Sequence, residues 1–334
     1  MSQLRHLVLS DPGLRGPEYG VLRDFEDEIC RVTGGSRLTI PVTRRLAVAQ
    51  KYCANGFRYR TLRKFFPRAD LPVAADVVWA VLMGPENLTL DLFRQWDKGT
   101  KKILYLFDTM PTQMPALKFI LSRSKWDLLL CSFPDAVEVL KRETGLPWTC
   151  IPQGVLPARF RPVPFNERQI GFSSYGRRID SIHQAVQEFC AKWGIYYDFS
   201  LWSGLRGDVS NLDAYRAYAW HLSHSVFTLA YPVETTHPAR AGSLSPITCR
   251  WFEAAAAATP IVGMTPSHPE YKAILGNDFH VPLDPKLGRQ EALERLEVIW
   301  RKREELSKEA VYLAERDSAK WTWESRVRAI LDTL

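Results

Sequence analysis

The sequence predicts an α/β fold built from two doubly wound parallel sheets. From residue 6 onward, apolar runs bounded by turn residues alternate with amphipathic helical segments. Continuously apolar runs are typical of strands buried in a parallel sheet, and their alternation with helices indicates crossover connections. The alternation stops once, at residues 156–169, where three prolines and mixed charge without periodicity indicate a linker, and it then restarts. We therefore expect two domains facing across a cleft, with ligands at the carboxyl ends of the strands.

The first half of the chain carries six of these apolar runs. Strands are expected at 6–10, 36–42, 75–84, 101–109, 126–133 and 147–155. Helices are expected at 20–33, 88–96, 116–124 and 135–145. The last of these helices has an aspartate near its start and Gly145 at its end, which are typical start and stop residues.

The second half repeats the pattern after the linker. Strands are expected at 170–176, 196–202, 226–232, 260–264 and 279–283, and helices at 178–194, 213–225, around Glu253 and at 268–275. The chain is helical from residue 288 onward, and 321–334 forms a separate amphipathic helix. The expected domains are 1–155 and 170–315, followed by a C-terminal helix at 316–334.

Length and composition suit globular domains. The chain has 334 residues, 46% of them hydrophobic, and no apolar run reaches the roughly 20 residues that a membrane-spanning helix needs. The apolar run in MSQLRHLVLSDPG is too short for a signal peptide, so a cytoplasmic protein is expected. The six cysteines form no C-x-x-C pair, which predicts reduced thiols and neither a disulfide framework nor a metal site.

Positive charge is concentrated in one stretch. The formal net charge is +7, and residues 44–68 interleave basic residues, among them Arg58 and Arg60, with aromatic residues and contain no Asp or Glu. One hypothesis is that this stretch binds an anionic acceptor or makes a peripheral contact with the inner face of a membrane. A solvated basic face with its aromatic rings turned inward is an equal alternative. Single-stranded nucleic acid is a third, although no nucleic-acid motif is present and no specific nucleic acid is expected.

The most informative stretch is ITCRWFEAAAAATPIVGM, residues 247–264. Small residues from Ala254 to Ala258 let this helix approach its neighbours closely, and Pro260 ends it. The start of such a helix exposes free N–H groups and a positive dipole end, which suits phosphate. A packing helix with a solvated Glu253 is an alternative of about even weight.

This stretch resembles the donor-binding helix of GT-B glycosyltransferases of the family-4-like, or group 1, type. The family pattern is E-x7-E followed by A-x-A-x-G-T-P-V-V; Glu253 matches the second glutamate, which holds the nucleotide ribose, while the first falls at Ser245. The form T-C-R-W-F-E, with Arg250 at its centre, is similar to a divergent branch related to spore-coat-type glycosyltransferases. The resemblance covers residues 147–280 and implies two Rossmann-like domains in the GT-B fold. It implies that domain 1–155 lies on the acceptor side and that domain 170–315 binds the nucleotide sugar. In the family the last helix crosses back to the first domain, which the sequence leaves open here.

Two further loops carry donor-binding candidates. Gly176 permits a tight turn after the strand at 170–176, and Arg177 matches a family arginine that lies beside the pyrophosphate. The family lysine that follows is missing, so Arg178 or Arg206 is the candidate for the second charge. Leu205 precedes Arg206 in WSGLRGD and is a candidate to pack on the nucleobase. Solvated arginines and a plain turn are the corresponding structural alternatives.

The loop HPARAGSLSPIT, residues 237–248, precedes the Glu253 helix. Its backbone N–H groups and the hydroxyls of Ser243, Ser245 and Thr248 are expected to surround the donor phosphate and sugar.

Catalytic and acceptor-side candidates lie in the first half. Asp108 ends a buried strand and is the first candidate for a general base, with Asp11 and Glu18 next. A carboxylate that caps the following loop is an equal alternative for Asp108, and a retaining mechanism, which the resemblance favours, needs no enzyme base. Gly13 and Gly16 permit close backbone approach on the acceptor side.

Together these patterns predict a metal-independent glycosyltransferase. It would move a sugar from a nucleoside-diphosphate-sugar donor to an acceptor hydroxyl on a glycan, lipid-linked glycan or natural product, without a cofactor. The alternatives left open are a nucleic-acid-binding protein, a nucleotide-sugar 2-epimerase and a non-catalytic protein of the same fold.

Overall fold

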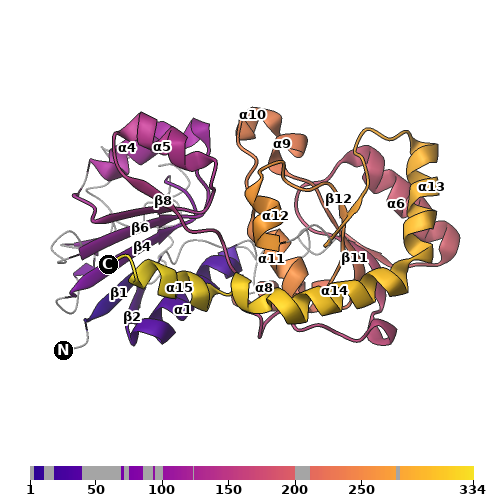
Figure 1. Cartoon of the computed structure of the whole chain (residues 1–334), viewed down its shortest axis with the longest axis horizontal. Helices are drawn as coiled ribbons and strands as arrows, with labels where there is room; N and C mark the ends of the chain where they lie inside the picture. The colour runs from indigo at the N-terminus through magenta and orange to yellow at the C-terminus, as the bar shows by residue number, and fades with distance from the viewer. Residues whose placement is uncertain are drawn as a thin grey trace. The chain divides into compact units, whose positions relative to one another are not determined.

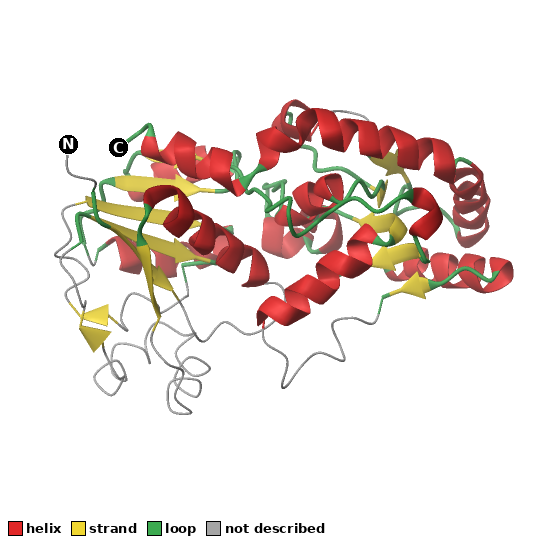
Figure 2. Ribbon diagram, turned by 90° about the horizontal axis from the view of Figure 1, so that it is seen from below, coloured by secondary structure: helices red, strands yellow, loops and turns green. Residues whose placement is uncertain are grey.

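Two fully parallel sheets form the framework of the molecule. The computed structural model describes residues 4–10, 19–39, 69–70, 75–85, 93–94, 101–122, 124–199, 211–275 and 279–334. The larger sheet has six strands and the smaller has five, and every strand pair in both is parallel. Helices accompany the strands in both sheets (Figures 1 and 2). The predicted fold class of two doubly wound α/β sheets is confirmed.

The chain divides into two compact units. Unit 1 comprises Met1–Arg15, Leu22–Pro152 and Arg326–Leu334, and unit 2 comprises Gly16–Val21 and Gln153–Ser325. The last residues of the chain therefore belong to the first unit.

The sheet of unit 1 has the order β2-β1-β4-β6-β7-β8. Its strands are β1 (His6–Ser10), β2 (Ser36–Thr39), β4 (Val77–Leu82), β6 (Lys101–Leu106), β7 (Leu128–Cys131) and β8 (Trp148–Cys150). β1 is flanked by β2 and β4, so the chain winds in one direction from β1 to β2 and in the other from β4 onward. β1 and β4 are buried along their whole length, which explains the apolar run 7–9 in β1 and the continuously apolar sequence of β4.

Helices pack on both faces of this sheet. The helices of unit 1 are α1 (Gly20–Thr33), α4 (Met114–Leu121), α5 (Ala136–Thr144) and the end of α15 (Trp323–Leu331). α4 and α5 lie on one face and α1 on the other (Figure 1). The ring of Phe25 on α1 lies 4.7 Å from the ring of Tyr105 on β6. At the end of the chain, Lys101 Nζ donates to the carbonyl of Leu334 over 2.5 Å.

The sheet of unit 2 has the order β10-β9-β11-β12-β13. Its strands are β9 (Ile170–Ser174), β10 (Tyr197–Asp198), β11 (Ser225–Ala230), β12 (Ile261–Gly263) and β13 (His280–Pro282). The winding direction reverses between β9 and β11, which pair directly. A crevice outside the carboxyl ends of such a strand pair is the usual ligand position in doubly wound sheets.

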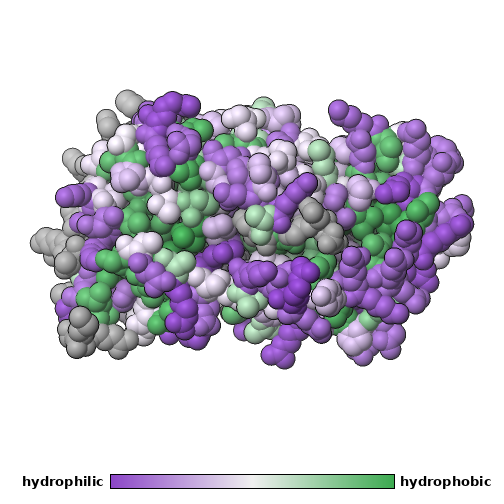
Figure 3. Space-filling view, viewed as in Figure 1, coloured by the Kyte–Doolittle hydropathy of each residue, from purple (hydrophilic) through white to green (hydrophobic). Residues whose placement is uncertain are grey.

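The helices of unit 2 surround this sheet. They are α6 (Asp180–Trp193), α8 (Asn211–Ser223), α9 (Val233–Thr236), α10 (Pro238–Ala241), α11 (Cys249–Ala256), α12 (Glu270–Leu275), α13 (Arg289–Arg301) and α14 (Arg303–Asp317). Phe172 of β9 shares a buried cluster with Val186 of α6 and Leu296 of α13. Hydrophilic side chains predominate on the visible surface of α14 (Figure 3).

The segment 156–169, expected to be a linker, packs within unit 2. Phe160 is fully buried, and its ring lies 5.6 Å from that of Tyr215 on α8. The Arg168 guanidinium donates to the backbone carbonyls of Val163, Ser225 and Ala258 at 2.9–3.0 Å. This arginine therefore ties the segment to the start of β11 and to the turn that follows α11.

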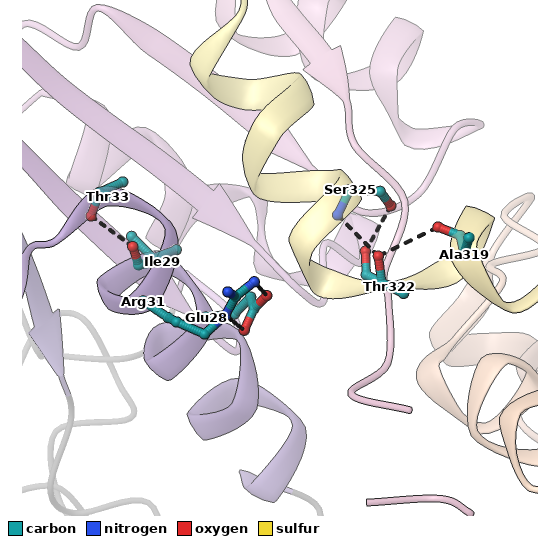
Figure 4. Close-up of polar contacts among 7 residues, drawn as sticks. All are labelled: Glu28, Ile29, Arg31, Thr33, Ala319, Thr322 and Ser325. Carbon is teal, nitrogen blue, oxygen red and sulfur yellow. Dashed lines mark hydrogen bonds and ion pairs between the residues drawn. The ribbon is translucent and has the colours of Figure 1, made fainter. Parts of the chain in front are cut away.

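Several helix ends are closed by local hydrogen bonds. Gly145 ends α5 with φ of 68°, as its sequence position predicts, and its N–H donates to the carbonyl of Lys141. Thr322 precedes α15 and accepts a hydrogen bond from the N–H of Ser325 at 3.0 Å, the usual cap geometry (Figure 4). At the end of α1, the Thr33 hydroxyl donates to the carbonyl of Ile29 (Figure 4).

One expected helix is wrong where the structure describes it. Within the predicted helix 88–96, residues Phe93–Arg94 form strand β5, which pairs in parallel with β3 (Ala69–Asp70). The run Leu88-Thr89-Leu90-Asp91-Leu92 alternates apolar and polar residues with a period of two, which is a strand pattern. This period of two favours a strand over the predicted helix.

Candidate functional site

The candidate site lies in unit 2, outside the carboxyl ends of β9 and β11. We call the residues that follow these two strands, together with the start of α11, the switch-point site. Gly176 and Arg177 follow β9, Glu234 follows β11, and Arg250 is in the first turn of α11. Parallel strands bring their carboxyl ends to one edge, so side chains on these segments gather there.

Gly176 and Arg250 come together although they are far apart in sequence. Gly176 has φ of 86°, a left-handed conformation that suits glycine. A Cβ atom at this position would lie 2.3 Å from Nη2 of Arg250. The guanidinium therefore lies against the bare backbone of the turn, where a pyrophosphate could meet both the charge and nearby backbone N–H groups. The sequence predicts a donor-binding role for both residues, and the fold brings them into contact.

Replacing Gly176 by alanine is expected to weaken binding of a nucleoside diphosphate by roughly tenfold, because the new Cβ displaces the Arg250 guanidinium. The measurement is a titration of the wild type and the variant with UDP, GDP, dTDP and ADP. The matched control is Gly194→Ala, since Gly194 has φ of 64° but no atom within 4 Å of its added Cβ. Both variants carry the backbone strain, so equal affinities in the two would contradict the prediction.

Glu253 is buried between α11 and α8. Only 2% of its surface is exposed, and its two carboxylate oxygens accept hydrogen bonds from Tyr215 at 2.5 Å and Tyr218 at 2.8 Å. Burial raises the pKa of Glu253, while the two tyrosine hydroxyls and Arg250 act in the opposite direction. Burial also holds the pKa of Tyr218 well above its ordinary value, so this hydroxyl stays a donor. The alternative of a solvated Glu253 is excluded, and its contact with ribose remains a prediction.

The loop before α11 places three of the predicted residues differently. Thr248 is the N-cap residue, with extended backbone, and its side chain makes no cap hydrogen bond. Ser243 is exposed. Ser245 is buried, its hydroxyl donates to a carboxylate oxygen of Glu234, and it accepts a hydrogen bond from the N–H of Ser267 at 2.6 Å.

The two arginines after β9 have different surroundings. Arg178 donates to the carbonyl of Phe199 at 2.6 Å and lies over the ring of the same residue. It thereby fixes the segment that follows β10. Arg177 and Arg178 both line a small pocket. Its other lining residues are Ser174, Ile179, Ile182, His183, Tyr197, Leu229 and Tyr231.

A buried polar cluster beside the site was missed in the sequence. Asp198, at the end of β10, accepts hydrogen bonds from Tyr175 at 3.3 Å and from His221 Nδ1. The Tyr175 ring lies 4.9 Å from the ring of Tyr218, which connects this cluster to Glu253. Burial is the main cause that raises the pKa of Tyr175. The spacing of Tyr215, Tyr218 and His221 at three-residue intervals on α8 was the available indication of a shared helix face.

Glu234 was also missed. It lies in α9, shortly after the end of β11, so a search for carboxylates soon after a buried strand, as used for Asp108, would have selected it as well. Asp108 follows β6 in unit 1, and its N–H donates to the carbonyl of Met83 at 2.6 Å. That position is compatible with either a catalytic or a capping role.

The remaining candidates lie outside the described residues. They are Asp11, Gly13, Gly16, Glu18, Arg58, Arg60, Leu205 and Arg206, with the basic stretch 44–68. Their predicted roles on the acceptor side, at the membrane and at the nucleobase therefore stay predictions.

Within the described ranges, no group of three or more His, Cys, Asp or Glu residues has the geometry of a metal site. None of the described helices is long and apolar enough to cross a membrane.

Comparison with known proteins shows similarity at the level of structure. No protein-family model matches the sequence, and no curated protein sequence matches it significantly. A sucrose-phosphate synthase from Thermosynechococcus elongatus is similar with a TM-score of 0.57 at 12% identity, covering 99% of this chain and 98% of that one. WaaG, a glycosyltransferase involved in lipopolysaccharide biosynthesis, is similar with a TM-score of 0.51 at 14% identity, covering 99% of both chains. A glycosyltransferase from Rickettsia africae ESF-5 has a TM-score of 0.51 at 9% identity, covering 100% of this chain and 98% of that one.

These similarities extend over the whole chain, and they agree with the two parallel sheets and their winding order. At such low identity they establish the fold and not the reaction. This chain therefore has the GT-B fold, with two Rossmann-like units.

Proposed function

We propose that this protein is a glycosyltransferase that transfers a sugar from a nucleoside-diphosphate sugar to an acceptor hydroxyl. The observation that carries the proposal is the Arg250 guanidinium packed on the Gly176 turn, at the carboxyl edge of the second sheet. A guanidinium beside glycine backbone and a helix start suits a diphosphate. Two of the structurally similar proteins, WaaG and the protein from Rickettsia africae ESF-5, are glycosyltransferases, which agrees with this function.

In the reaction, the diphosphate leaves with negative charge as the sugar–oxygen bond breaks. Arg250 would offset that charge, together with the positive end of α11, without a metal ion. Glu253 would hold the ribose hydroxyls. The transfer would retain configuration; Asp108 would be the general base if it inverts configuration instead.

The first experiment is a thermal-shift screen with UDP, GDP, dTDP, ADP and CMP, each with and without magnesium. A shift with one diphosphate that does not depend on magnesium supports the proposal and identifies the base. A flat screen contradicts it.

Glu253→Ala is expected to weaken binding of that diphosphate by about 1–3 kcal/mol, because a buried carboxylate–hydroxyl pair with ribose is lost. Calorimetric titration measures the change. The control is Tyr215→Phe, which removes one hydroxyl from Glu253 but leaves the carboxylate in place. An affinity that is unchanged in Glu253→Ala, or that falls equally in both variants, would argue against a direct contact between Glu253 and ribose.

A further inference from the structure

The turn that follows β9, residues 175–178, carries Gly176 against the Arg250 guanidinium. We call these residues the β9 turn. Ser174 is the last residue of β9, and it pairs with Leu229 of β11. Beyond Ser174 the chain leaves the sheet, so side-chain hydrogen bonds help to set the shape of the turn. A turn that is held in place before a ligand arrives loses less conformational freedom when the ligand binds, and it therefore binds more tightly.

Two side chains of the β9 turn bind the end of β10. The Tyr175 hydroxyl donates to Oδ2 of Asp198 at 3.3 Å, and Arg178 donates to the carbonyl of Phe199 at 2.6 Å. The two acceptors are consecutive residues, so the turn is tied at its first and last residue to one short segment. Tyr175 and Asp198 are each only 2% exposed, and water therefore competes little for the hydrogen bond between them. This bond fixes the residue directly before Gly176.

The Asp198 carboxylate is itself held by α8. Nδ1 of His221 donates to the same oxygen, Oδ2, that accepts the Tyr175 hydroxyl. A carboxylate oxygen can accept two donors at once, and its charge strengthens both bonds. The Tyr175 ring also packs edge-on against the ring of Tyr218, whose hydroxyl donates to Glu253. Asp198 therefore connects the β9 turn to the helix that also binds Glu253.

We propose that Asp198 is a positioning residue for the diphosphate of the donor: it holds the Tyr175 hydroxyl and thereby keeps Gly176 against the Arg250 guanidinium. The inference rests on the proposed function and adds to it a residue that acts through another side chain. Because Asp198 acts through Tyr175, removing both groups has the same effect on diphosphate binding as removing either one.

The test measures the dissociation constants of UDP, GDP, dTDP and ADP for the wild type and three variants. For the diphosphate that the wild type binds most tightly, Tyr175→Phe, which removes only the hydroxyl, is expected to raise the dissociation constant roughly fivefold. Asp198→Ala is expected to raise it by about the same factor. By charge alone, loss of a carboxylate strengthens the binding of an anion, so weaker binding indicates positioning. The double variant is expected to bind as each single variant does.

Asp198→Asn keeps the size of the side chain and one acceptor oxygen, and it guards against misfolding of Asp198→Ala. Its dissociation constant is expected to lie between those of the wild type and Asp198→Ala. The matched control is Tyr105→Phe, which removes another buried hydroxyl, one that donates to the carbonyl of Ile151 at 3.0 Å in unit 1. It is expected to lower the melting temperature and to leave the diphosphate affinity unchanged.

Two results would overturn the inference and leave the proposed function standing. One is an unchanged diphosphate affinity in both Tyr175→Phe and Asp198→Asn. The other is a double variant in which the two effects multiply to about 25-fold, because Asp198 would then act independently of Tyr175. If none of the four diphosphates binds the wild type, the proposed function fails and the inference fails with it.

Discussion

Replacing Arg168 by methionine is expected to lower the free energy of unfolding of unit 2 by about 3–5 kcal/mol. Arg168 is 8% exposed, and its guanidinium donates to three backbone carbonyls that belong to separate segments. Burial lowers its pKa to about 10, so it remains charged at neutral pH and its hydrogen bonds are charge-assisted. Methionine fills most of the space but leaves the carbonyls of Val163, Ser225 and Ala258 without this donor.

Thermal unfolding followed by circular dichroism measures this loss. For a unit of this size, each kcal/mol of lost unfolding free energy lowers the melting temperature by about 2–4 °C. Arg168→Lys is expected to fall between the wild type and Arg168→Met, since one ammonium cannot reach three carbonyls in different directions. The control is Arg161→Met, which changes an exposed arginine of the same segment and should shift the midpoint by little. If Arg168→Met and Arg161→Met have the same melting temperature, Arg168 does not stabilise the unit.

The contacts of Arg168 could not be predicted from a single sequence. The prolines of 156–169 and its lack of periodicity predicted a linker, and they gave no sign of its buried contacts, because local patterns carry no information about partners far along the chain. Two of the carbonyls that Arg168 binds lie 57 and 90 residues away. An arginine buried against backbone oxygens looks the same in the sequence as a surface arginine.

The strands were predictable for a physical reason. Parallel strands such as β4 and β11 are covered on both faces, so every position along them is apolar or small, and this gives an unbroken run. Helix ends such as Gly145 were predictable because their backbone geometry favours one residue type. The strand β5, which pairs with β3, was predicted to be helical although the residues just before it alternate with the period of two that is typical of a strand.

Some residues of the candidate site could also be predicted from the sequence, and others could not. Gly176 and Arg250 were identified because glycine and arginine carry their chemistry in their residue type. The partners of Glu253 were not, since Tyr215 and Tyr218 look like ordinary core aromatics on α8.

Glu26 in unit 1 is expected to make the stability of the protein depend on pH. It lies on α1, its side chain has no exposed surface, and Oε2 accepts hydrogen bonds from Ser10 at 2.6 Å and Arg23 at 2.7 Å. Arg37 lies 3.7 Å from the same oxygen, yet Oε1 is buried and has no hydrogen-bond partner among the residues described. Burial outweighs the two arginines and raises the pKa of Glu26 from 4.5 to about 7.

A pKa that is higher in the folded state means that folding favours the protonated form. The stabilisation from Glu26 is therefore complete below about pH 4.5, the ordinary value, and is lost as the pH rises through about 7. A shift of this size corresponds to about 3 kcal/mol between those limits. Glutamine mimics the protonated acid and does not ionise, so Glu26→Gln should not show this loss.

The melting temperature of Glu26→Gln relative to wild type is therefore expected to rise by roughly 6–12 °C between pH 4.5 and pH 8. Taking the difference between the variant and the wild type at each pH removes the contributions of all other titrating groups. The control is Glu138→Gln, a glutamate of α5 whose side chain is 82% exposed, for which little difference is expected at either pH. A difference for Glu26→Gln that stays constant with pH would mean that the arginines keep Glu26 ionised throughout, and that their attraction outweighs burial.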